Sequence, residues 1–284
     1  MAQEQYRTVD ILEKDTGSIN FLYRTALGRC VLKVLINRVF SKILGAILDT
    51  RLSKCFIKRF IKGSGIRMED YVQEQYRSFN AFFTRHIRPE CRPITMDRDA
   101  LVSPCDGKLT VYPITEDAVF RIKNSSYDIE SLLEAPELAK EFAGGTCLVF
   151  RLCPDDYHRY HYSHWGKVVR TKKIRGVLHT VRPVAFDRYP IFKKNSREYA
   201  LLDTEDFGPV IQMEVGALFV GRIKNHPVES FSRGDERGMF EFGGSTIVML
   251  YSKDAIELDP VFLENTRNKK ETVVTMGMQL GKAK

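Results

Sequence analysis

The spacing of hydrophobic and polar residues changes along the chain, from a helical period before about residue 95 to short strand-like runs after it. Within Cys30–Leu48 the polar residues recur about every 3.6 positions, which predicts a helix with one narrow polar stripe and a wide apolar face. Gly63-Ser64-Gly65 interrupts this pattern. A second helix is predicted over Met68–His86, with its aromatic residues packed against the rest of the fold.

The later part of the chain is typical of a β-rich domain. Apolar and β-branched runs alternate there with Gly, Pro, Asn and Asp, and one helix, Ile129–Phe142, is expected to end at Gly144-Gly145. The predicted strands are Lys108–Tyr112, Cys147–Leu152, Val168–Ile174, Tyr199–Asp203, Val210–Ile223 and Ser245–Tyr251. We therefore predict an α+β fold, with a helical region over residues 1–95 and a mostly antiparallel β core over residues 96–284.

The net charge of +8 is concentrated near the N-terminus. Residues 21–65 hold ten basic side chains and one acidic side chain, a net charge of +9, so the remainder is close to neutral. A basic helix with a wide apolar face is typical of the headgroup region of an anionic bilayer. The alternative is a core helix whose lysines extend to water. Nucleic acid is disfavoured as a partner because so large an apolar face does not suit contact with phosphates.

Other features limit where the protein could act. The six cysteines are scattered and form no Cys-x-x-Cys pair, which favours reduced thiols in a cytoplasmic compartment. The first residues lack the apolar segment of a secretory signal. No stretch approaches the roughly 18 uncharged apolar residues that a spanning helix requires. We expect a peripheral protein on the cytoplasmic face of the cell membrane.

Three short stretches combine reactive side chains with turn residues: Ser103–Gly107, Pro154–His161 and Phe242–Thr246. An aspartate before a glycine is by itself only a turn former. The histidine pair in the second stretch could bind a metal from one helix face, but no third ligand is suitably spaced, so no metal is expected.

Together, Asp, His and Ser are the parts of an activated hydroxyl group. Ser245 lies outside a Gly-x-Ser-x-Gly elbow, because Ile247 stands where that motif has its second glycine. The carbonyl group nearest to Ser245 is that of Gly244. Because Gly243 and Gly244 have no side chains, the backbone can bend and bring this carbonyl close to the hydroxyl.

Five stretches, in the same order along the chain, resemble the motifs of the phosphatidylserine decarboxylase family. They are SFNAFFTRHIRPECRPI (Ser78–Ile94), SPCDG (Ser103–Gly107), FAGGTCLVFRLCPDDYHRYH (Phe142–His161), GALFVGRI (Gly216–Ile223) and RGDERGMFEFGGST (Arg233–Thr246). Any one of these motifs is weak evidence, whereas their shared order is specific.

The resemblance implies a self-processing enzyme with a pyruvoyl cofactor. Asp106, His161 and Ser245 match the family's self-cleavage triad, in which the histidine deprotonates the serine and the serine oxygen attacks the Gly244 carbonyl. Cleavage would give a β chain of residues 1–244 and an α chain of residues 245–284, which stay associated. Ser245 would become the pyruvoyl group. This group would form a Schiff base with phosphatidylserine and release CO2 and phosphatidylethanolamine. His158 matches the proton donor to the α-carbon, a role that suits an imidazole with an ordinary pKa near 6.5.

Several alternatives stay open at this point. The same three side chains could form a membrane-associated hydrolase acting on an external ester. The chain could also be a non-enzymatic lipid-binding protein. A pyruvoyl enzyme acting on a soluble amino acid is disfavoured, because such a substrate does not require the basic N-terminal segment. Phosphatidylserine in anionic membranes is the expected partner, and the sequence leaves a homodimer open.

Overall fold

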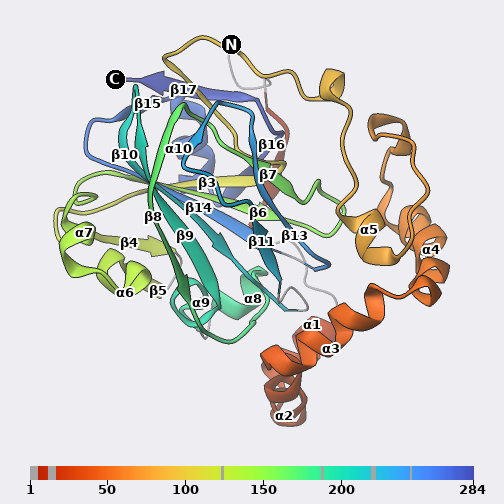
Figure 1. Ribbon diagram of the computed structural model, residues 1–284. Coiled ribbons are helices and arrows are strands. Elements are labelled where there is room, and N and C mark those ends of the chain that lie inside the picture. The colour runs from red at the N-terminus through yellow and green to blue at the C-terminus, as the bar shows by residue number, and fades with distance from the viewer. Residues whose placement is uncertain (1–5, 12–16, 123–124, 187–188, 219–221, 244) are drawn as a thin grey trace.

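The computed structural model describes residues 6–11, 17–122, 125–186, 189–218, 222–243 and 245–284. Its helices before about residue 65, drawn in red to orange in Figure 1, lie on one side of a β body that contains most of the remaining chain. The predicted α+β class is confirmed: helices come first, and antiparallel sheets follow. The predicted boundary near residue 95 stays a prediction.

A nine-stranded sheet, antiparallel at every pairing of its strands, forms the centre of the β body. Its order is β1 (Thr8–Asp10), β16 (Lys270–Val274), β3 (Gly107–Pro113), β6 (Thr146–Leu152), β14 (Ser245–Tyr251), β10 (Gly208–Val215), β9 (Arg197–Thr204), β8 (Gly166–Ile174) and β12 (Ser230–Phe231). All seven residues of β14 are buried, and its five apolar residues alternate between two hydrophobic clusters, as the period of two in a strand requires. This strand is therefore in the middle of the core.

Three smaller sheets surround the large one. They are β11 (Ile223–Asn225), β13 (Glu236–Phe240) and β7 (Arg159–His161); β15 (Ile256–Leu258), β17 (Gln279–Ala283) and β2 (Ala100–Val102); and β4 (Val119–Ile122) with β5 (Ser125–Asp128). The predicted strands lie where expected, with one exception. The run Val210–Ile223 is not a single strand, because β10 ends at Val215 and β11 begins at Ile223.

The single helix expected over Cys30–Leu48 is wrong. The chain forms two helices there, because the Asn37 side chain accepts a hydrogen bond of 2.8 Å from the Val39 backbone N–H and caps a new helix. The predicted break at Gly63–Gly65 is confirmed, since Gly65 has a left-handed φ of 69°. The helices of this region are α1 (Gly17–Arg24), α2 (Ala26–Leu35), α3 (Arg38–Leu48), the 3₁₀ helix η1 (Arg51–Lys54) and α4 (Cys55–Ser64).

The helix expected over Met68–His86 is also wrong. Only η2 (Met68–Asp70) and α5 (Phe79–Phe83) are helical, and the Ser78 side chain starts α5 by accepting a hydrogen bond of 3.2 Å from the Ala81 N–H. The aromatic residues of this segment are buried as predicted, namely Tyr71, Phe79, Phe82 and Phe83. Their packing, more than helical periodicity, explains the apolar pattern.

The helix expected over Ile129–Phe142 is divided as well. Glu134 has a left-handed φ of 48° after α6 (Ile129–Leu133), and Pro136 begins α7 (Pro136–Lys140) because proline is accepted in a first helical turn. The remaining helices are η3 (Pro89–Cys91), α8 (Pro183–Phe186), α9 (Ile191–Lys194) and α10 (Pro260–Arg267). Within the described residues, no helix has the length and apolar character needed to cross a membrane. All six cysteines are free.

Candidate active site

Ser245 is the first residue of β14 and is completely buried. It is paired with Leu152 on β6, and the next residue, Thr246, is paired with Val215 on β10. Within the described chain, the Ser245 Oγ atom has no hydrogen-bond partner. A buried polar atom without a partner costs on the order of 1–3 kcal/mol, so its presence calls for an explanation. A reacting hydroxyl is one such explanation.

The segment before Ser245 comes from β13 and ends in the two glycines. Gly243 has a φ of 132°, which side-chain-bearing residues rarely adopt. Gly244, the other half of the predicted cleavage site, is outside the described residues. Gly243 therefore has a conformation that favours glycine, and the strand that begins at Ser245 is held in place by the sheet.

His158 lies just before β7, with its ring 4.2 Å from the Phe83 ring between centroids. Its Nδ1 atom is 2.9 Å from the Asp156 carbonyl oxygen. A carbonyl can only accept, so Nδ1 carries the proton in the neutral ring, and the buried Nε2 has no hydrogen-bond partner among the described residues. Burial lowers the pKa of His158 to about 3, although the Asp156 and Gly243 backbones act in the opposite direction. The pKa of the buried ring is therefore lower than the ordinary value expected from the sequence, and the ring is neutral near pH 7.

His161 is the last residue of β7 and lies opposite Glu236 on β13. Its backbone N–H donates a 2.8 Å hydrogen bond to the Pro104 carbonyl, and its ring stacks with Tyr157 at 6.2 Å. Burial lowers the pKa of His161 to about 4, while the negative charges of Glu236 and Asp106 act to raise it. Nδ1 is buried without a described partner, so this imidazole is also neutral.

Asp106 lies in the turn between β2 and β3, the turn that the His161 backbone contacts. Its carboxylate accepts hydrogen bonds from Arg92 Nε at 2.9 Å and from the Met276 backbone N–H at 2.8 Å. Within the described residues no hydrogen bond joins it to His161, and it acts on that ring through its charge. The structure thus brings two members of the predicted triad into one region without the hydrogen bond that a Ser-His-Asp arrangement uses. The roles assigned to the four site residues stay predictions.

Sequence reasoning missed three residues that shape this site. Arg92 holds the Asp106 carboxylate, while Phe83 and Tyr157 cover the two imidazole rings. Arg92 and Phe83 both lie within the Ser78–Ile94 stretch that resembles the family, and this was the available signal. The contacts themselves join segments far apart in sequence, so no local pattern indicated them.

The two histidines are not on a helix, which removes the geometry considered for a metal site. No group of three or more His, Cys, Asp and Glu side chains is arranged to hold a metal ion in the part of the chain that the structure describes.

A cavity of about 230 Å³ lies against Gly243 and Cys153. An open groove of about 800 Å³ lies beside it, with mostly apolar walls from α3, α4 and α5. The cavity and the groove share Pro154, Arg182 and Phe242 in their linings. The apolar groove thus lies next to a smaller cavity, which reaches Gly243.

Comparison with known proteins gives a consistent result. The sequence profile of the family described as phosphatidylserine decarboxylase matches residues 79–282. The phosphatidylserine decarboxylase proenzyme 2 of Clostridium acetobutylicum is 45% identical over 266 residues, which cover 93% of this chain and 91% of that protein. The phosphatidylserine decarboxylase proenzyme of Clostridium perfringens is 39% identical, with 93% and 92% covered. That of Clostridium botulinum is also 39% identical, with 96% of each chain covered.

Proposed function

The chain belongs to the phosphatidylserine decarboxylase family, and we propose that it cuts its own Gly244–Ser245 bond and then decarboxylates phosphatidylserine at a membrane surface. One observation carries the proposal. The buried Ser245 hydroxyl has no described partner, and it directly follows a glycine turn whose backbone acts on the neutral imidazole of His158. A reacting hydroxyl and neutral bases are the groups that self-cleavage requires.

In the proposed cleavage, His161 accepts the Ser245 hydroxyl proton and the oxygen attacks the Gly244 carbonyl carbon. The C–N bond breaks as the Ser245 nitrogen takes a proton, and an ester replaces the amide. Loss of the Ser245 α-proton then expels the Gly244 carboxylate and leaves dehydroalanine, which water converts to a pyruvoyl group and ammonia. Burial keeps the His161 ring neutral near pH 7, so it can accept a proton, and the negative charges of Glu236 and Asp106 favour the protonated ring that results.

The residues around position 245 fit a pyruvoyl group, since Ser245 is its source and Gly243 leaves space beside it. Such a group would supply an electrophilic carbonyl that accepts the electrons released with CO2. His158 takes a proton from the substrate ammonium at Nε2, holds it, and returns it to the α-carbon. The substrate carboxylate would favour the charged ring while it is present, so a histidine with a pKa of about 3 could hold the proton until the carboxylate leaves as CO2 and then donate it.

The groove and the cavity together suit a phospholipid. We propose that the groove holds acyl chains, because its walls are mostly apolar, and that the cavity holds the serine headgroup, because it lies against Gly243, two residues before Ser245. The phosphate of such a lipid would then lie at Pro154, Arg182 and Phe242, which line both the groove and the cavity. Arg182 is the cation among them, and guanidinium groups bind phosphate in a bidentate manner. Arg182→Gln is therefore expected to raise KM for phosphatidylserine while cleavage proceeds normally.

The N-terminal helices supply a surface for a bilayer. Several large apolar side chains on α2 and α3 are exposed, among them Val34 at 59%, Val39 at 63% and Ile43 at 56%. These exposures are not those of core helices, and the basic residues of the same segment favour anionic headgroups. We propose a peripheral position on the cytoplasmic face of the membrane.

The two chains would stay together after cleavage. β14 is paired with β6 over seven residues and with β10 over six, so the new terminus at position 245 is held between two strands of the larger chain. β16 adds three pairs to β3, and β17 is paired with β2. Separation would expose a fully buried strand, at a cost of about 25 cal/mol per Å² of apolar surface.

The hydrolase alternative is less well supported. Ser245 has no exposed surface, whereas an ester from outside must reach the serine of a hydrolase. The carbonyl of the adjacent residue is available without such access.

The proposal is tested with Ser245→Ala beside the wild-type protein, each incubated with phosphatidylserine vesicles. We expect the wild type to appear as two chains and to release CO2, and the variant to stay whole and inactive. CO2 release by Ser245→Ala would overturn the proposal, as would a wild-type chain that stays intact while it turns over lipid.

A further inference from the structure

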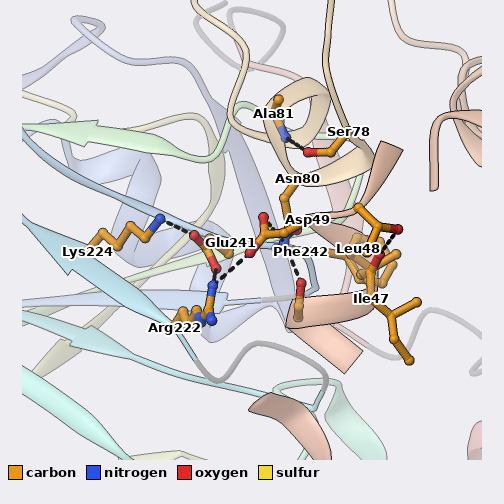
Figure 2. A network of polar contacts seen from close by, with 12 residues as sticks. Ile47, Leu48, Asp49, Ser78, Asn80, Ala81, Arg222, Lys224, Glu241 and Phe242 are labelled. Atoms are coloured by element: carbon orange, nitrogen blue, oxygen red, sulfur yellow. Dashed lines mark hydrogen bonds and ion pairs between the residues drawn. The ribbon is translucent and has the colours of Figure 1, made fainter. Parts of the chain in front are cut away.

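A polar network joins the end of helix α3 to the residues that precede the processing site, and Figure 2 shows it from close by. At its centre is Asn80 of α5, which is 3% exposed. The Asn80 Nδ2 atom donates to the Gly45 carbonyl at 3.2 Å and to Asp49 Oδ1 at 3.0 Å. Its Oδ1 accepts from the Phe242 backbone N–H at 3.4 Å. The contact on Phe242 lies two residues before the proposed scissile bond.

The chemistry of these partners is specific for an amide side chain. Two acceptors, a carbonyl and a carboxylate, face the NH₂ group, and one donor faces the oxygen. Rotating the amide by 180° would oppose like groups at all three contacts, so the orientation of Asn80 is determined by its neighbours.

The network continues on both sides of Asn80. Arg222 Nη1 donates to Asp49 Oδ2 at 2.9 Å and to Glu241 Oε2 at 3.0 Å, and Lys224 pairs with the other oxygen of Glu241. Glu241 and Phe242, adjacent in sequence, are thus both tied to α3 (Figure 2).

The Phe242 side chain is held by the same part of the molecule. Its ring makes edge contacts with Phe79 at 5.1 Å, Phe83 at 5.2 Å and Phe60 at 6.3 Å between centroids. Phe79 and Phe83 are on α5, beside Asn80, and Phe83 also covers the His158 ring. One short helix therefore fixes Phe242 and contacts a site imidazole.

Attack on the Gly244 carbonyl requires that this group has a fixed position relative to the Ser245 hydroxyl. The sheet holds Ser245 through its pair with Leu152 on β6, and the next residue, Thr246, is paired with Val215 on β10. Two glycines, with the widest choice of backbone angles, separate Ser245 from Phe242. The geometry at the scissile bond then depends on how firmly Phe242 is held, and its described backbone N–H contact is the Asn80 side chain.

We infer that Asn80 is a positioning residue for self-cleavage, connecting α3 through Asp49 to the backbone two residues before the scissile bond. This inference rests on the proposed function. It adds that the end of α3 is linked to the processing site through Asn80. The helix that presents apolar residues to a membrane also helps to set the geometry of the processing site. After cleavage the carbonyl no longer needs alignment, so loss of the Asn80 contact should slow cleavage far more than it slows turnover by the cleaved enzyme at saturating lipid, where an effect of Phe242 on lipid binding is not measured.

The first test uses Asn80→Leu, which has a similar shape and none of the three hydrogen bonds. The first-order rate at which newly synthesised full-length chain becomes two chains is measured in a cell-free pulse–chase. We expect this rate to fall by on the order of tenfold or more, because small misplacements of reacting groups carry penalties of that size. The rate of CO2 release per cleaved chain should stay within about twofold of wild type.

A double-mutant cycle that exchanges the amide and the carboxylate between positions 80 and 49 tests the link to α3 separately. Asn80→Asp keeps an acceptor for Phe242 but places a carboxylate against Asp49, so cleavage should slow. Adding Asp49→Asn restores a donor opposite position 80, and the double variant should recover most of the lost rate. The cycle also keeps the inference testable if Asn80→Leu does not fold.

Ser78→Ala is the matched control, because it removes the Ala81 cap of the same helix without touching Phe242. Wild-type cleavage by Asn80→Leu, no recovery in the double variant, or equal slowing by Ser78→Ala would each overturn the inference. If instead the wild type and the control both stay uncut, the proposed function has failed, which is a different outcome.

Discussion

The strands around Ser245 and the helices α1–α4 differ in how far their side chains are buried. The central strand β14 is buried along its whole length, and the Ser245 hydroxyl at its start, the group proposed to react, is sealed from solvent. In the helical region the reverse holds. Nine of the thirteen large apolar side chains that are exposed in the described chain lie between Phe21 and Phe56. The strands keep water away from the Ser245 hydroxyl, and the helices leave large apolar side chains exposed.

The difference shows how a buried site can act on a lipid. A soluble substrate would have to reach Ser245 through water, whereas the apolar groove beside Phe242 begins at the helices that expose apolar residues. The two regions meet at the network around Asn80 and Asp49, where the helical region contacts the glycine turn. The predictions below separate the contributions of the two regions.

Within the β core, His161→Ala should have the largest effect. The neutral imidazole is the proposed acceptor of the Ser245 proton, so we expect no cleavage and therefore no CO2 release. Gel electrophoresis of the purified variant after prolonged incubation measures this. Normal processing of His161→Ala would show that another base removes the proton.

His158→Ala should leave cleavage intact and impair the second reaction. General acid–base catalysis contributes roughly 10²–10⁴-fold, so kcat per cleaved chain should fall by about that range. The measurement is CO2 release normalised to the amount of small chain. An uncleaved His158→Ala protein would reverse the division of labour between the two histidines.

In the helical region, Val39→Ser combined with Ile43→Ser should weaken binding to anionic vesicles. Each side chain is worth about 1.5–3 kcal/mol when transferred from water, so a loss of at least about tenfold in binding is expected. Cosedimentation at low salt measures the effect. Val169→Ser, equally exposed on β8, is the control, and an equal loss there would remove the helical region from the account.

The smallest expected effect is a dependence of stability on pH. Burial lowers the pKa of His158, His161 and His164 to about 3, 4 and 3, against about 6.5 in an unfolded chain. Below pH 6.5 the unfolded state binds more protons, so the free energy of unfolding should fall as the pH decreases. Each histidine contributes up to about 1.4 kcal/mol per pH unit.

Denaturant unfolding of the uncleavable Ser245→Ala chain at pH 7.5 and 5.5 measures this dependence. His164→Gln should reduce the difference between the two pH values, because His164 is buried against Phe207 and Tyr251. Equal stability at both pH values would mean that the three rings are not buried as neutral groups.

The sequence predicted the β core better than the helical region for a physical reason. Strands such as Cys147–Leu152 and Ser245–Tyr251 contain apolar runs of four and five residues, and this composition favours their burial. The helices were decided by single residues: Asn37 caps α3, and the left-handed Glu134 ends α6. The effect of one such residue extends over only a few positions, so the hydrophobic periodicity averaged over a whole segment does not reveal it.

The candidate active site was likewise predicted only in part from the sequence. The stretches that carry Asp106, His158, His161 and Ser245 were found from motifs, and the structure brings them into one part of the molecule. The depressed histidine pKa values could not be predicted, because they result from burial by residues distant in sequence, such as Phe83 over His158. The Arg92 contact to Asp106 likewise exists only in the folded chain.

The central claim is that the Gly244–Ser245 bond breaks and its serine becomes the reactive carbonyl. Intact-mass measurement of the purified wild-type protein tests it most directly. The account predicts two chains in place of one of 32.7 kDa, with the smaller chain beginning at position 245 and bearing a pyruvoyl group instead of a free amine. An active preparation consisting of one unbroken chain with an ordinary serine would contradict it.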